Sequence, residues 1–312
     1  MKFQQKIVPY LWFDNQAEEA TDDYAAAFAA VGREASIGHI SRYGEATEEV
    51  SGIPAGAVMT VEFELAGHKF IALNGGPQFR FTPAVSFFVG CETEEEVDGL
   101  WDRLSQGGET LMPLDSYPFS EKYGWLNDKY GVSWQIILAP AGQKITPALL
   151  FVGEQFGKAE EAMTFYTSLF EDSEIDAISR YGPEHGDQEG KVAHATFSLA
   201  GQRFIAMDSG LEHKFTFTEA TSLFVNCQGQ EEVDRLWAQL TAGGGEESMC
   251  GWLKDRFGVS WQIVPTRLME LLSDEDAEKA ERVTEAMLQM RKIEIADLEA
   301  AYKGKTHGAE DN

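Results

Sequence analysis

Several long blocks of this 312-residue sequence occur twice, in the same order. The best-preserved pair is YGWLNDKYGVSWQI at 123 and CGWLKDRFGVSWQI at 250, which are identical at 10 of 14 positions. Other pairs include QKIVPYL with QKITPAL and two copies of ISRYG, and the offset stays near 134 to 138 before it falls to 127. Repetition over this length indicates duplication of a whole domain. We therefore predict domains at residues 1–142 and 143–266, followed by a tail at residues 267–312.

Within each copy, the same alternation of strand and helix patterns occurs twice. Runs rich in β-branched and aromatic residues, such as KIVPYLWF, predict strands. The Ala- and Glu-rich stretch 17–31 has helical spacing and stops at Gly32. A later helix opens on Thr93 with Glu96 three residues on, which predicts a capping box. The pattern therefore predicts an α+β fold with two βαβββ modules per copy, four in all.

The tail has a different pattern from both copies. Residues 268–304 read as helical, with the N-cap expected at Ser273 or Asp274. Val283, Met287, Met290 and Ile293 share one face of this segment, and such a stripe is typical of a docking face rather than of a cofactor site.

Alternation along the strands assigns one apolar and one polar face to each sheet. In KVAHATFSLAG, the apolar row contains Ala195, Phe197 and Leu199, whereas His194 and Thr196 point the other way. The apolar row should lie beneath a helix, and the polar row should line a cup. A curved sheet with helices outside and polar side chains inside is typical of a small-molecule site.

Charge and composition restrict the classes of partner. The chain has 52 acidic and 25 basic side chains and a net charge of −27, so we expect neither nucleic acid nor an anionic membrane as a partner. No apolar run approaches the roughly 20 residues of a membrane helix, and the N-terminus does not read as a secretory signal. The three cysteines lack the spacing of a disulfide framework or zinc site, which favours a reduced, cytoplasmic protein.

The repeated modules resemble the vicinal oxygen chelate superfamily, which includes glyoxalase I, the bleomycin-resistance proteins and the extradiol dioxygenases. IVPYLWF, both copies of the GVSWQI block, YPFSEKYGW and the tail AMLQMRKIEIADLEAAY are most similar to its PhnB-like, 3-demethylubiquinone methyltransferase-like branch. The resemblance spans nearly the whole chain and implies two glyoxalase-like cupped sheets with outer helices. Since single-copy relatives pair to complete their cups, it also implies a monomer acting as a pseudo-dimer, or a homodimer.

Metal-dependent members of the superfamily place His or Glu ligands on the inward faces of four strands. The corresponding residues here are Pro9 or Tyr10, Asn74, Ser86 and Gln135 in the first copy, and Ala148, Asp208, Ser222 and Gln262 in the second. Neutral amides and hydroxyls are poorer transition-metal ligands than imidazole or carboxylate. We therefore expect no metal and no cofactor, with a weakly bound divalent ion as the alternative. The polar members of these two sets are candidates for binding a small-molecule ligand: Asn74, Ser86, Gln135, Ser222 and Gln262.

Three ionisable side chains are candidates for catalysis. His194 stands where the first copy has Thr60 and could act as a base near neutral pH, or be a hydrogen-bonded strand histidine without a catalytic task. Asp208 could orient His194 or bind substrate, and the alternative is that it begins the turn at DSG. Glu62 could act as an acid if burial raises its pKa.

Two further motifs supply candidates for ligand binding. The repeated ISRYG could clamp a carboxylate or phosphate, or anchor the loop that follows, through Arg42, Tyr43, Arg180 and Tyr181. Trp125 and Trp252 each follow a glycine at a strand start and could line the cup, whereas Trp134 and Trp261 share the apolar row.

Two classes of function follow from the sequence. The first is a small-molecule binding protein of the glyoxalase/bleomycin-resistance type. The second is a lyase or isomerase acting on a vicinal-oxygen substrate, with one active copy. A 3-demethylubiquinone-type methyltransferase ranks last, because no glycine-rich nucleotide loop follows a strand.

Overall fold

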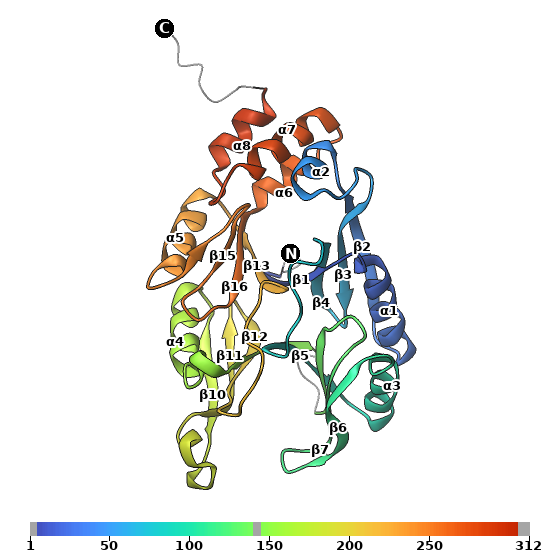
Figure 1. The fold of residues 1–312 in the computed structure, drawn as a ribbon, viewed down its shortest axis with the longest axis vertical. Helices are drawn as coiled ribbons and strands as arrows, with labels where there is room; N and C mark the ends of the chain where they lie inside the picture. The colour runs from blue at the N-terminus through green and yellow to red at the C-terminus, as the bar shows by residue number, and fades with distance from the viewer. Residues whose placement is uncertain (1–4, 140–144, 305–312) are drawn as a thin grey trace. The chain divides into compact units, whose positions relative to one another are not determined.

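A computed structural model describes residues 5–139 and 145–304, and in this part of the chain two mixed sheets of eight strands carry the fold (Figure 1). The strands are β1 (Ile7–Phe13), β2 (Ala35–Arg42), β3 (Val58–Leu65), β4 (His68–Asn74), β5 (Val85–Cys91), β6 (Glu109–Tyr117), β7 (Ser120–Asn127), β8 (Ser133–Leu138), β9 (Ile145–Phe151), β10 (Glu174–Arg180), β11 (Val192–Leu199), β12 (Gln202–Asp208), β13 (Thr221–Cys227), β14 (Glu246–Glu247), β15 (Trp252–Lys254) and β16 (Ser260–Pro265). The helices are α1 (Ala17–Ala30), α2 (Glu45–Ser51), α3 (Glu94–Leu104), α4 (Ala159–Leu169), α5 (Gln230–Thr241), α6 (Thr266–Leu272), α7 (Ala277–Leu288) and α8 (Ile295–Tyr302), with short 3₁₀ turns η1 (Gly153–Gln155) and η2 (Pro183–Gln188).

The element order confirms four βαβββ modules, which begin at β1, β5, β9 and β13. Sheet B combines the second and third modules in the order β10-β11-β12-β9-β5-β8-β7-β6. Sheet A combines the first and fourth modules in the order β14-β15-β16-β13-β1-β4-β3-β2. Each sheet thus takes one module from each copy, an exchange that resembles the pairing of two separate subunits. The domain boundaries at 142 and 266 follow the sequence repeat and stay a prediction.

The described chain forms two compact units. The first contains Pro9–His39 and Thr60–Thr221, and so includes all of sheet B with α1, α3 and α4. The second contains Ile40–Met59 and residues 222–304, with α2, α5 and the three tail helices. No helix within the described ranges is both long enough and apolar enough to span a membrane.

Sheet B has one face covered by helices. α3 contacts β5, β7 and β8, whereas α4 contacts β9, β10, β11 and β12. The predicted apolar row lies on this side, since Ala195, Phe197 and Leu199 are at most 1% exposed, while His194 is exposed to solvent. Large buried rings such as Trp134 fill the same layer. The alternation of the sequence therefore identifies the core face correctly.

The repeated D-x-x-G-V-S-W motif closes each copy with a hydrogen-bonded turn. One oxygen of Asp128 accepts the backbone N–H groups of Tyr130 and Val132, and the other accepts the indole N–H of Trp134 at 2.8 Å. Asp255 receives the equivalent bonds from Phe257, Val259 and Trp261 in the second copy. The aspartate is therefore retained because it joins the turn to the core tryptophan, a use of a buried carboxylate that satisfies several donors at once.

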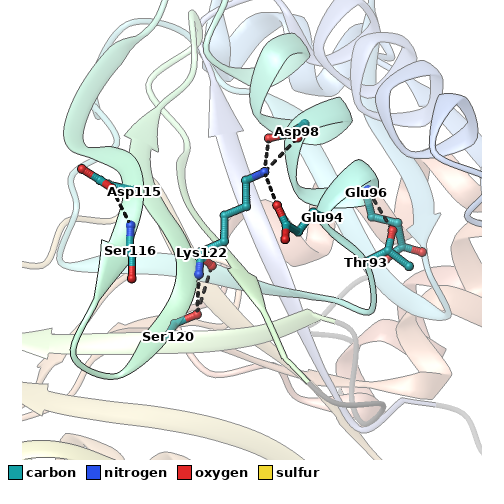
Figure 2. Close-up of polar contacts among 8 residues, drawn as sticks. All are labelled: Thr93, Glu94, Glu96, Asp98, Asp115, Ser116, Ser120 and Lys122. Atoms are coloured by element: carbon teal, nitrogen blue, oxygen red, sulfur yellow. Dashed lines mark hydrogen bonds and ion pairs between the residues drawn. The ribbon is translucent and has the colours of Figure 1, made fainter.

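The start of α3 agrees in part with the predicted capping box (Figure 2). The hydroxyl of Thr93 accepts the backbone N–H of Glu96, as expected for an N-cap. The carboxylate of Glu96 instead accepts the N–H of Glu92 and pairs with Arg33 at 2.7 Å. α1 ends as predicted, because Gly32 adopts the left-handed conformation with φ +76°.

The tail is helical but is divided into α6, α7 and α8. The predicted N-cap at Ser273 or Asp274 is wrong, since Asp276 caps α7 by accepting the N–H of Lys279. Val283 and Ile293 of the predicted stripe are fully buried within the second unit, where α7 packs against α2, α6 and α8.

Candidate functional site

The face of sheet B opposite α3 and α4, here called the open face, gathers several of the predicted residues. Ser86 and Phe88 lie beside Ser133 and Gln135 in the parallel pairing of β5 with β8. Across β9, β12 and β11, the same face continues to His194, as the strand registers require. All of these strands belong to the first unit.

A hydrogen-bonded network lies at the centre of the open face. The side-chain amide of Gln135 donates to the hydroxyl of Ser86 at 2.8 Å, and its carbonyl oxygen accepts the hydroxyl of Tyr123. These three side chains are at most 3% exposed. Both polar ends of the amide are therefore satisfied within the protein, which fixes its orientation.

The second copy keeps only part of this network. In the second unit, Gln262 donates to Ser222 at 2.9 Å, which matches the bond from Gln135 to Ser86. Cys250 occupies the sequence position of Tyr123, so the phenol that completes the first network has no counterpart there. The two copies thus differ at the residue that contacts the glutamine carbonyl.

Aromatic rings from the β6–β7 hairpin lie against Tyr123 of this network. Tyr117 stacks on Phe119 with centroids 5.7 Å apart, and Phe119 meets the edge of Tyr123 at 5.0 Å. Phe119 is 63% exposed at the hairpin tip. The hairpin belongs to the segment MPLDSYPFSEK that is longer in the first copy, whereas β14 and β15 are short.

The same hairpin is fixed to α3 by ion pairs (Figure 2). Lys122 on β7 contacts Glu94 at 3.1 Å and Asp98 at 2.7 Å, and Figure 2 shows its side chain extending from the strand to both carboxylates. Ser120 bonds the backbone of Lys122 and so orders the start of β7. These contacts hold the aromatic tip in place relative to the sheet.

His194 is the predicted catalytic residue that the structure places on the open face. Its imidazole lies edge-on to Phe88, with centroids 6.3 Å apart. Partial desolvation by the surrounding protein lowers its pKa from the usual 6.5, although the side chain remains accessible. A neutral imidazole with access to solvent can accept a proton.

Asp208 and Asn74 serve helix starts instead of facing the open side. The carboxylate of Asp208 accepts the N–H groups of Gly157, Ala159 and Val192, and desolvation raises its pKa. Asn74 accepts the N–H of Ala17 at 2.8 Å in the first copy. Asp208 therefore satisfies donors at the start of α4, and Asn74 does the same for α1. Asp208 would have to release these bonds to contact a substrate.

The two ISRYG motifs make matching contacts with the loops that follow them. Arg42 donates to the carbonyl of Gly56 at 2.9 Å, and Arg180 donates to that of Gly190 at 3.0 Å. Arg180 also forms a bidentate pair with Glu160 of α4, which places it on the helix side. The backbone N–H groups of Tyr43 and Tyr181 bond the same loops, and burial raises the pKa of both phenols. These contacts match the loop-anchoring alternative.

The remaining candidates are distributed over both sheets. Trp125 lies opposite Gln135 and donates its indole N–H to Ser133 at 2.8 Å, so it belongs to the open face of sheet B. Trp252 lies opposite Gln262 in sheet A. Glu62 is half-buried on β3, and among the described residues its carboxylate has no hydrogen-bond partner.

Polar side chains at the ligand positions of the open face are bonded to one another. Ser86 and Gln135 stand at two of the four ligand positions, and they bond each other instead of presenting free lone pairs to one point. Over residues 5–139 and 145–304, no three His, Cys, Asp or Glu side chains converge in a way that could hold a metal. Amide and hydroxyl oxygens alone are weak ligands for zinc-like ions.

Sequence reasoning missed Tyr123, Phe88, Tyr117 and Phe119 as members of the site. The longer hairpin segment in the first copy was the available signal, because an insertion rich in aromatic residues next to a candidate strand often carries function. The pairing of Phe88 with His194 could not be found this way, because it joins strands from different copies.

Comparison with known proteins agrees with this architecture. The 3-demethylubiquinone-9 3-methyltransferase family matches the chain twice, at residues 5–137 and 143–264. A PhnB protein from Bacillus cereus is 47% identical over 43% of this chain and 100% of its own, with a TM-score of 0.39. A Staphylococcus aureus protein is 30% identical over 44% of this chain and 98% of its own, with a TM-score of 0.18.

One solved structure aligns over most of this chain, and at its low sequence identity the similarity concerns the fold alone. A glyoxalase I variant from Zea mays is 9% identical and aligns over 83% of this chain and 94% of its own, with a TM-score of 0.51. A comparison with curated proteins finds no match. Because the family pattern covers most of the sequence in two consecutive copies, the chain belongs to the 3-demethylubiquinone-9 3-methyltransferase family, within the glyoxalase-like fold.

Proposed function

We propose that the open face of sheet B binds a small organic molecule without a resident metal ion. The observation that carries this proposal is the exposed aromatic group at the tip of the β6–β7 hairpin, next to the buried Gln135 network. Phe119 is 63% exposed although it stacks on Tyr117, and an exposed apolar cluster beside fixed polar groups is typical of a binding surface. The hydrogen bond between Ser86 and Gln135 supports binding by polar and aromatic contacts instead of metal coordination.

A thermal-shift screen of small aromatic and vicinal-oxygen compounds tests this proposal. A hit should raise the midpoint of the wild-type chain, and the shift should be lost in Phe119→Ser and reduced in His194→Gln. Leu211→Ser is the matched control, because Leu211 is also exposed, at 65%, but lies outside the open face. The shift should also survive treatment with a chelator. A shift that Phe119→Ser and His194→Gln leave intact, or that needs an added divalent metal, would contradict the proposal.

A catalytic role on the same face is the second candidate, and His194 favours it. Its lowered pKa keeps the imidazole neutral at pH 7, so it can remove a proton from a bound substrate. If the protein is a lyase or isomerase of this kind, His194→Gln should reduce kcat by about 10² to 10⁴, the usual contribution of general base catalysis. Binding measured by calorimetry should be weakened but not lost, in keeping with the reduced thermal shift. Turnover that His194→Gln does not change would exclude this assignment.

Methyl transfer, which the family description names, is the third candidate. A methyltransferase needs a site for a methyl donor, and the sequence has no glycine-rich nucleotide loop after a strand. S-adenosylmethionine belongs in the same thermal-shift screen. A saturable shift with this compound would favour the methyltransferase over the other two candidates.

A further inference from the structure

A cavity separate from the open face lies at the end of β1. Its volume is about 330 Å³, and its wall includes Trp12, Phe79, Phe81 and Tyr130. Trp12 and Phe79 meet edge to face at 4.9 Å, and Trp12 is further held by a bond from its indole N–H to the carbonyl of Gly76 at 2.8 Å. None of the lining residues belongs to the open face of sheet B. The size is near the lower limit for small-molecule sites.

Two opposite charges line the same cavity. Asp14 and Arg80, which are both exposed to solvent, contribute to the wall. Within the described ranges, neither side chain forms an ion pair or a hydrogen bond, with each other or with another residue. By contrast, Arg33, Arg180 and Arg267 each pair with a glutamate. An aromatic cavity with one unpaired anion and one unpaired cation can take a ligand that carries both charges.

The charge of the whole chain favours such a ligand over a simple anion. With a net charge of −27, the protein repels a small carboxylate at long range. A zwitterion has no net charge and escapes this repulsion, while its carboxylate can still form two hydrogen bonds with Arg80 and its ammonium can pair with Asp14. The aromatic walls would contact an apolar or aromatic side group.

The second copy provides an internal comparison. In the aligned repeats, Trp12 and Asp14 correspond to Leu150 and Val152, and Arg80 corresponds to Thr216. Both charges and the indole are therefore absent from the equivalent positions. Since the copies share their fold but not these three residues, the charged pair is not a requirement of the βαβββ module.

We propose that this cavity is a binding site for a compact zwitterion with an aromatic side group, such as an aromatic α-amino acid. Arg80 would bind the carboxylate, Asp14 the ammonium, and Trp12 with Phe79 the ring. The site does not depend on the function proposed for the open face.

Calorimetry on the full chain tests the proposal with three probes that differ by one charged group. Phenylalanine carries both charges, 2-phenylethylamine lacks the carboxylate, and 3-phenylpropionate lacks the ammonium. Phenylalanine should bind, and each of the other two should bind at least about tenfold more weakly, as expected for loss of a charge-assisted hydrogen bond. Arg80→Gln and Asp14→Asn should each weaken phenylalanine binding by a similar factor.

The controls separate this site from the rest of the molecule. Arg103→Gln removes an exposed arginine from α3 and should leave phenylalanine binding unchanged. Phe119→Ser and His194→Gln should also leave it unchanged, so failure here is distinguishable from failure of the open-face proposal. No saturable binding of phenylalanine, equal or tighter binding of either single-charge probe, or affinities that Arg80→Gln and Asp14→Asn do not alter would each overturn the proposal.

Discussion

Replacing Asp128 by alanine is expected to lower the free energy of unfolding by about 3 to 5 kcal/mol, because the change leaves several buried donors without an acceptor. The carboxylate accepts the backbone N–H groups of Tyr130 and Val132, the indole N–H of Trp134 at 2.8 Å and the hydroxyl of Tyr24 at 2.7 Å. Its side chain is almost fully enclosed, so water cannot easily replace it. Urea unfolding followed by tryptophan fluorescence measures the loss.

The pH dependence of this loss has a definite sign. Burial raises the pKa of Asp128 from the usual 3.8 to about 6, against the opposing effect of its hydrogen bonds. Because the folded-state pKa lies above the unfolded one, the stabilisation linked to this group is complete below about pH 4 and declines as the pH rises through about 6. The difference between wild type and Asp128→Ala should therefore be larger near about pH 5 than near about pH 7.

Two companion variants show whether the effect belongs to the motif. Asp102→Ala removes an exposed carboxylate from α3 and should change stability by no more than about 0.5 kcal/mol. Asp255→Ala removes the equivalent acceptor in the second copy, which serves Phe257, Val259 and Trp261, and should also destabilise strongly. Similar small effects for Asp128→Ala and Asp102→Ala would show that the turn does not need its carboxylate.

Features set by nearby residues could be read from the sequence. The polar and apolar rows of β11, the turn at Asp128 and the Thr93 cap depend on spacings of a few residues, and the structure confirms them. The hydrogen-bond partners of Asp208 depend on where α4 begins, 49 residues away along the chain. Alternation along β12 places Asp208 on the helix-covered side with Phe204 and Ala206, but the backbone donors that it bonds come from another element and could not be named from the strand alone.

Contacts between segments that are far apart in the chain could not be predicted from the sequence. The modules are similar enough that pattern alone does not show which of them share a sheet, and so Phe88 and His194 could not be brought together in advance. The cavity at Asp14 and Arg80 could not be predicted either, because its walls come from three separate segments. These are the end of β1, the loop after β4 and the turn before β8. Alignment of the two copies does show that Asp14 and Arg80 are replaced in the second copy.

A chain cut after residue 142 is expected to form a homodimer or to aggregate. In the whole protein, β9 pairs antiparallel with β5 along Val85–Val89, so the cut removes this partner and exposes an apolar strand edge. β1 of a second copy can take the place of β9, because IVPYLWF and ITPALLF are equivalent segments of the repeat.

Size-exclusion chromatography with light scattering measures the outcome. Residues 1–142 should elute at twice the mass of one half, or as larger species, because an unpaired central strand is costly in water. Adding residues 143–312 should convert them to a one-to-one complex, since β9 then restores the pairing with β5 seen in sheet B. If residues 1–142 form a soluble monomer that does not bind residues 143–312, the pseudo-dimer arrangement is contradicted. It would mean that β5 tolerates an open edge and that each copy is stable by itself.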